Sequence, residues 1–110
     1  MVSKKILVLG CLAAAISATA AQAEEIVELR AAGGTFEPLR LAVPAGAPFK
    51  IKVTNGEKVP VEFESFELHR ERVVQPGDTI TVNMPALSAG SYKFFDDFND
   101  KTPQGEIVAK

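Results

Sequence analysis

A regular alternation of apolar and polar side chains does most to narrow the folds open to this chain. Phe49, Ile51 and Val53 alternate with lysine and threonine residues, and segment 79–84 repeats the pattern. Alternation with a period of two is typical of a strand that buries one face and leaves the other in water. Residues 24–110 contain no helical period longer than two turns. The sequence therefore predicts an all-β domain.

Turn residues separate the predicted strands. Glycine, proline and asparagine suit turns, and they cluster at Gly33-Gly34, Pro44-Ala45-Gly46, Asn55-Gly56 and Pro76-Gly77-Asp78. The strands predicted between them are 26–31, 36–43, 48–55, 61–66, 79–84, 90–97 and 107–109. Seven to eight short strands at a spacing of about ten residues indicate a Greek-key β-sandwich with antiparallel sheets.

The N-terminal segment 1–23 has the pattern of a secretory signal peptide. Lys4 and Lys5 precede an apolar stretch that runs to about Ala15, and small residues at 21–23 form a cleavage site. We expect cleavage there, so that 24–110 form a single exported domain. The apolar stretch is too short to span a bilayer, and we expect no transmembrane span in the mature chain.

The exported domain is acidic and has no thiol. Cys11 would leave with the signal, so neither a disulfide nor a copper–thiolate bond is available. Lys4 and Lys5 would leave too, so that ten basic residues remain against 14 acidic ones. Without a basic patch, nucleic acid is not an expected partner. A Ser/His/Asp arrangement, a nucleophile elbow and a phosphate loop are also missing, so a conventional enzyme is not expected.

The segment 90–97 is a predicted strand that ends in two candidate functional residues. Tyr92, Phe94 and Asp96 lie two residues apart and share one face of the predicted strand, and Asp97 follows directly. Two adjacent carboxylates thus stand at the start of a loop that connects two strands. Such a loop is a typical place for a binding site.

The spacing of this segment resembles the C-terminal copper loop of the cupredoxins, on the pattern of Gly90, Tyr92 and Phe94 followed by a loop, a glycine and a last short strand. In blue-copper members the loop supplies a cysteine, a histidine and a methionine. The matching positions here read Asp96, Asn99 and roughly Pro103 or Gln104. Upstream, Asn55 and Pro60 match the approach to the first histidine ligand, whose position is Val61. The resemblance implies a cupredoxin-like sandwich in which every blue-copper ligand is replaced.

The run from Pro60 to His69 is similar to the E-F-E-S segment of small cupredoxin-like proteins of bacterial iron uptake, and the acidic pair Asp96-Asp97 matches as well. Asn99 departs from that branch, which commonly has a histidine there. The resemblance implies a periplasmic protein that binds copper, iron or both. It would assist ferrous iron oxidation or import, at most as an accessory, with an iron permease or a periplasmic iron-binding protein.

Candidate metal ligands in this chain are four carboxylates and one imidazole: Glu64, Glu67, His69, Asp96 and Asp97. Oxygen and imidazole ligands suit iron or Cu(II) better than Cu(I), which favours sulfur. Glu67, His69 and Glu71 would share a face if their segment is extended.

Two alternatives to a metal site stay open. The acids could lie on a solvated edge strand, or they could form ion pairs with Arg70, Arg72 and Lys93. The domain would then be a non-metal β-sandwich interaction module that binds a partner protein in the periplasm.

Overall fold

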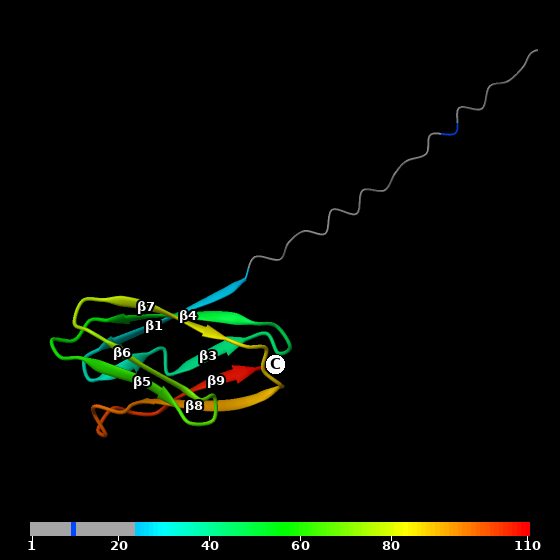
Figure 1. The fold of residues 1–110 in the computed structure, drawn as a ribbon. Coiled ribbons are helices and arrows are strands. Elements are labelled where there is room, and N and C mark those ends of the chain that lie inside the picture. Colours follow the sequence, from blue (N-terminus) through cyan, green and yellow to red (C-terminus); the bar gives the residue numbers. More distant parts are fainter. Residues whose placement is uncertain (1–9, 11–23) are drawn as a thin grey trace, which may run out of the picture.

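The computed structural model describes Gly10 and residues 24–110, and it is an all-β sandwich of nine strands in two sheets (Figure 1). Apart from Gly10, the predicted signal peptide lies outside the described residues. Among the residues that are described, no helix is long and apolar enough to cross a membrane.

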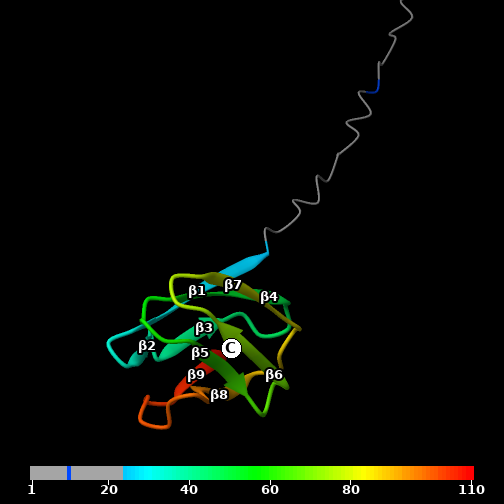
Figure 2. The same cartoon turned by 60° about the vertical axis from the view of Figure 1, so that its left-hand side comes forward.

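The first sheet has four strands in the order β2-β1-β4-β7, namely Thr35–Glu37, Glu25–Ala32, Phe49–Asn55 and Thr79–Met84. The second sheet has five strands in the order β3-β9-β8-β5-β6, namely Arg40–Val43, Gly105–Ala109, Gly90–Asp96, Val61–Ser65 and Arg70–Val74. Figure 2 shows the two sheets lying face to face, with the loop after β8 at the same end as β2.

The predicted β-sandwich is confirmed, with three differences in detail. The segment predicted as one strand over 36–43 divides at Pro38 into β2 and β3, which belong to different sheets. Proline cannot donate to a strand ladder, so the strand breaks there. The charged run that begins at Glu67 contains a further strand, β6, at the edge of the second sheet. In addition, β1 pairs with β4 and β3 with β9 in parallel, because each partner is reached by a crossover.

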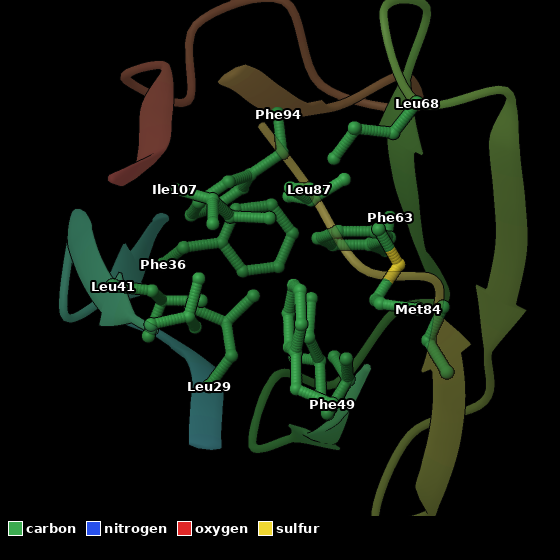
Figure 3. Close-up of a cluster of buried hydrophobic side chains, with 14 of the residues drawn as sticks. Leu29, Phe36, Leu41, Phe49, Phe63, Leu68, Met84, Leu87, Phe94 and Ile107 are labelled. Atoms are coloured by element: carbon green, nitrogen blue, oxygen red, sulfur yellow. The ribbon is translucent and has the colours of Figure 1, made fainter. Parts of the chain in front are cut away.

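Four phenylalanines form the centre of the core: Phe36, Phe49, Phe63 and Phe94 (Figure 3). The rings of Phe63 and Phe94 lie 5.4 Å apart, and Phe36 meets Phe94 edge-on at 5.7 Å. Met84 is buried among them, as its alternation predicted. Because the inward positions of β5 and β8 are filled by Phe63 and Phe94, their immediate neighbours must point outward.

Candidate metal centre

The loop end of the sandwich brings together the positions where the resemblance places blue-copper ligands. Val61, Asp96 and Asn99 line a cavity of about 120 Å³ there, together with Glu57. The Glu57 carboxylate accepts a hydrogen bond from the Gly34 N–H at 2.6 Å. The lining has no thiol and no imidazole, so these residues do not fit the His₂Cys set of a blue-copper centre.

Asp96 is buried at this end, with only 5% of its surface exposed. Its Oδ1 accepts hydrogen bonds from the Glu62 N–H at 2.9 Å and the Phe98 N–H at 3.0 Å. The side chain thus ties the first residues of the loop to β5. Two backbone donors of this region are satisfied by one carboxylate oxygen.

A second group of acids lies on the outer face of the second sheet. We call Glu62, Glu64 and Asp97 the carboxylate cluster. One side-chain oxygen from each lies within 4.8 Å of the others. Glu62 and Glu64 alternate on β5 with the inward Phe63, so they share the outward face. The structure therefore brings two of the predicted ligands, Glu64 and Asp97, together with Glu62.

The pairing of neighbouring strands sets this geometry. On one side of β5, Asp96 pairs with Phe63, and the Asp97 N–H donates to the Glu62 carbonyl at 3.1 Å. On the other side, Glu64 lies directly opposite Glu71 of β6. Like charges directly opposite each other destabilise a sheet. This arrangement therefore works against folding unless something offsets the charge.

Burial makes the cluster costly. Glu62 is 4% exposed and Glu64 is 9% exposed. Oε1 of Glu62 and Oε2 of Glu64 are buried and have no hydrogen-bond partner in the described part of the chain. A buried carboxylate is unfavourable unless it is paired, hydrogen-bonded, bound to a metal or protonated. The pKa of Glu62 is raised from 4.5 to about 7. Burial is the largest cause, and the neighbouring carboxyl groups of Glu64 and Glu71 add to it.

The arginines of β6 do not neutralise the cluster. Arg70 donates to the carbonyls of Leu68 and Asn83, and Arg72 donates to the carbonyl of Thr81. The two salt bridges among the described residues join Arg40 to Glu106 and Lys50 to Glu24. Within residues 24–110, the predicted ion pairs between the cluster acids and Arg70, Arg72 or Lys93 are therefore not formed.

The other two predicted ligands lie on the hairpin between β5 and β6. Residues 66–69 form a turn, so Glu67, His69 and Glu71 do not alternate along one extended face. The Glu67 carboxylate accepts a hydrogen bond from the Lys93 N–H at 3.4 Å. His69 instead lines a surface depression of about 300 Å³ with Glu64 and Glu71. The depression places the imidazole on the same side of the sheet as the cluster.

Glu62 was considered from the sequence, but it ranked below Glu64 and Asp97 and was not among the five predicted ligands. The signal that could have found it is its position two residues before Glu64 on a predicted strand, which places both acids on one face. The alternation of apolar residues at 61 and 63 marks that face as the outer one.

Comparison with known proteins places the chain in a family. The sequence model of the cupredoxin-like domain matches residues 5–109. An uncharacterised protein of Rickettsia prowazekii (strain Madrid E) is 36% identical over 73 residues, which cover 66% of this chain and 58% of that protein. The chain thus spans less than two thirds of that relative's length.

Similar solved structures share the fold at low identity. A purple cupredoxin from Nitrosopumilus maritimus is 18% identical, with a TM-score of 0.59 over 76% of this chain and 99% of that one. Auracyanin A, a "blue" copper protein from Chloroflexus aurantiacus, is 16% identical, with a TM-score of 0.63 over 80% and 100% of the two chains. Amicyanin from Paracoccus versutus is 16% identical, with a TM-score of 0.61 over 77% and 81%. By its sequence match over most of its length, the chain belongs to the cupredoxin-like domain family.

Proposed function

We propose that this chain is an exported metal-binding protein of the periplasm that assists ferrous iron oxidation or import. The cupredoxin fold suggests a copper-protein or electron-transfer type of module. In this chain, the cavity at the loop end, where the fold holds blue copper, is lined by no thiol or imidazole, and side-chain oxygens gather instead at the carboxylate cluster. The proposal is that copper, iron or both bind through these oxygens, and that the metal or its electrons pass to a membrane iron permease or a periplasmic iron-binding protein.

One observation carries the proposal: two buried carboxylates, each with an oxygen that has no partner among residues 24–110, converge with a third at the carboxylate cluster. Carboxylates suit hard or borderline ions such as iron and Cu(II). A bound cation would also offset the cost of burying Glu62 and Glu64.

The small domain implies that the protein acts with a partner. The exported chain would have 14 acidic against ten basic residues, and its acidic surface would attract a partner with a basic surface. Complementary charge mainly speeds encounter, so the association would weaken as salt is raised.

Gene deletion tests this function. The deletion strain should grow poorly when ferrous iron is limiting and nearly normally on ferric chelates. A gene that encodes Glu62→Gln with Asp97→Asn should fail to restore growth, whereas Glu67→Gln, which removes one negative charge outside the cluster, should restore it. Normal growth of the deletion strain on limiting ferrous iron would refute the iron role.

The alternative function, a non-metal β-sandwich interaction module, is favoured by an apolar feature beside the acids. Phe66 is 68% exposed, and its ring contacts that of Phe95 edge-on at 5.0 Å. If this patch rather than the acids carries the function, Phe66→Ser should abolish complementation and the double acid variant should not.

A further inference from the structure

We infer that the carboxylate cluster is an all-oxygen site for a hard trivalent cation of the iron(III) class, on the outer face of the second sheet. This inference deepens the proposed function by naming the position of the metal and the class of ion. It rests on metal binding by this chain, but it does not depend on a role in iron import.

The site is separate from the loop end where the fold family holds copper. Glu62, Glu64 and Asp97 are absent from the lining of the 120 Å³ cavity at that end. The inward Phe63, which is fully buried, lies between the two glutamates along β5. The backbone of β5 therefore separates the cluster from the core and points its acids the other way.

When Glu62 and Glu64 are ionised, their buried oxygens need a compensating positive charge. Glu62 and Glu64 are both more than nine-tenths buried, and each has an oxygen without a partner among the described residues. These residues also provide no lysine or arginine nitrogen within salt-bridge distance of the cluster. A cation that enters from solution would supply the missing contacts to both glutamates at once.

The spacing suits a single small ion. Oxygen ligands bound at about 2.1 Å lie at most about 4.2 Å apart across a metal. The cluster oxygens already lie within 4.8 Å of one another, so small side-chain rotations can close them on one ion. Asp97 is exposed, which leaves an open side through which an ion can enter and where water can complete the coordination.

Charge and ligand type narrow the class of ion. Three carboxylates carry three negative charges when ionised, and Glu71 adds a fourth opposite Glu64. When all three ligands are ionised, a trivalent ion balances their charge, whereas a divalent ion leaves one negative charge on the cluster. Oxygen-only ligands disfavour Cu(I). Ca²⁺ usually takes six to eight oxygens, whereas the cluster offers one from each of three acids.

Gallium(III) tests the site because it is hard, trivalent and inert to reduction in water. The purified protein would be dialysed against gallium citrate, and in parallel against Mn²⁺ and Cu²⁺, with the bound metal measured by elemental analysis. We expect one Ga³⁺ per chain, bound at least ten-fold more tightly than Mn²⁺. Glu62→Gln, Glu64→Gln and Asp97→Asn should each weaken Ga³⁺ binding by roughly ten-fold or more, as the loss of groups that support metal sites does.

Glu67→Gln is the matched control, because it removes one negative charge outside the cluster and keeps an oxygen for the Lys93 N–H. It should leave Ga³⁺ affinity unchanged. Circular dichroism would establish that each variant is folded. If Glu62→Gln or Glu64→Gln does not fold, the exposed Asp97→Asn still decides the question.

The inference fails if the protein binds no Ga³⁺ where it binds Cu²⁺, or if all three cluster variants bind Ga³⁺ as the control does. If either outcome were found and the deletion strain still grew poorly on ferrous iron, the trivalent site would be refuted and the proposed function would remain. Specific Ga³⁺ binding in a protein whose deletion has no ferrous iron phenotype would support the site and refute the iron import role.

Discussion

Replacing Asp96 by alanine should destabilise the domain through two orphaned backbone donors. The Asp96 carboxylate accepts from the Glu62 N–H inside the protein and from the Phe98 N–H in a half-buried position. Leaving a buried donor unpaired costs about 1–3 kcal/mol, and a more exposed hydrogen bond contributes about 0.5–1.5 kcal/mol. The free energy of unfolding should therefore fall by roughly 2–4 kcal/mol. For a domain of this size, that corresponds to a loss of roughly 10–25 °C in Tm.

Asp96→Asn provides the control, because its amide oxygen can accept the same two hydrogen bonds without the charge. We expect it to lose about 1 kcal/mol, since bonds to a charged acceptor are stronger than neutral ones. Urea unfolding followed by far-ultraviolet circular dichroism would measure both variants, because the chain has no tryptophan.

The reasoning would be refuted if Asp96→Ala unfolded within about 0.5 kcal/mol of the wild type, the range of ordinary surface substitutions. The same variants address Asp96 as a predicted metal ligand. If the metal lies at the carboxylate cluster, folded Asp96→Asn should bind it as the wild type does. A ten-fold loss of affinity in that variant would instead place Asp96 among the ligands.

Two further predictions concern pH and colour. The pKa of Glu62 is raised from 4.5 to about 7 in the folded protein. Protonated Glu62 therefore contributes fully to the free energy of unfolding below pH 4.5, and this contribution is lost as pH rises through 7. Without metal, the stability difference between wild type and Glu62→Gln should shift in favour of the variant between these values, and a difference independent of pH in urea titrations would contradict this assignment. A protein of residues 24–110 with Cu(II) should lack the intense band near ~600 nm of a copper–thiolate bond, because these residues contain no cysteine. Such a band in an absorption spectrum would overturn the oxygen-ligand assignment.

The strands could largely be predicted from local pattern. The alternation around Ile51 and the turn glycines mark them because side-chain direction along a strand depends only on the backbone period. The division at Pro38 was not predicted, since a proline in an apolar run does not reveal that the halves join different sheets. The parallel pairing of β3 with β9 was not predictable either, because it joins segments more than 60 residues apart.

The residues of the candidate site could likewise be identified from local sequence, but their arrangement in space could not. Glu64, Asp96 and Asp97 were singled out from the sequence, but their separation into two places was not. Asp96 is the last residue of β8 and Asp97 the first residue after it, and they serve different places: Asp96 lines the cavity at the loop end, and Asp97 belongs to the cluster. Residues 66–69 turn rather than extend, which removes Glu67 from the face predicted for it with His69 and Glu71.

By itself, the sequence determined the class of fold, the acidic balance and the absence of a thiol in residues 24–110, because these depend on composition and on neighbours along the chain. Only the tertiary structure decided which acids meet. The distance between Glu62 and Asp97 is set by the pairing of β5 with β8, and the opposition of Glu64 and Glu71 by the pairing of β5 with β6. Their burial, and the engagement of Arg70 and Arg72 with backbone carbonyls elsewhere, likewise follow from how the strands pack. Burial and charge pairing depend on contacts between distant segments, and no local pattern encodes them.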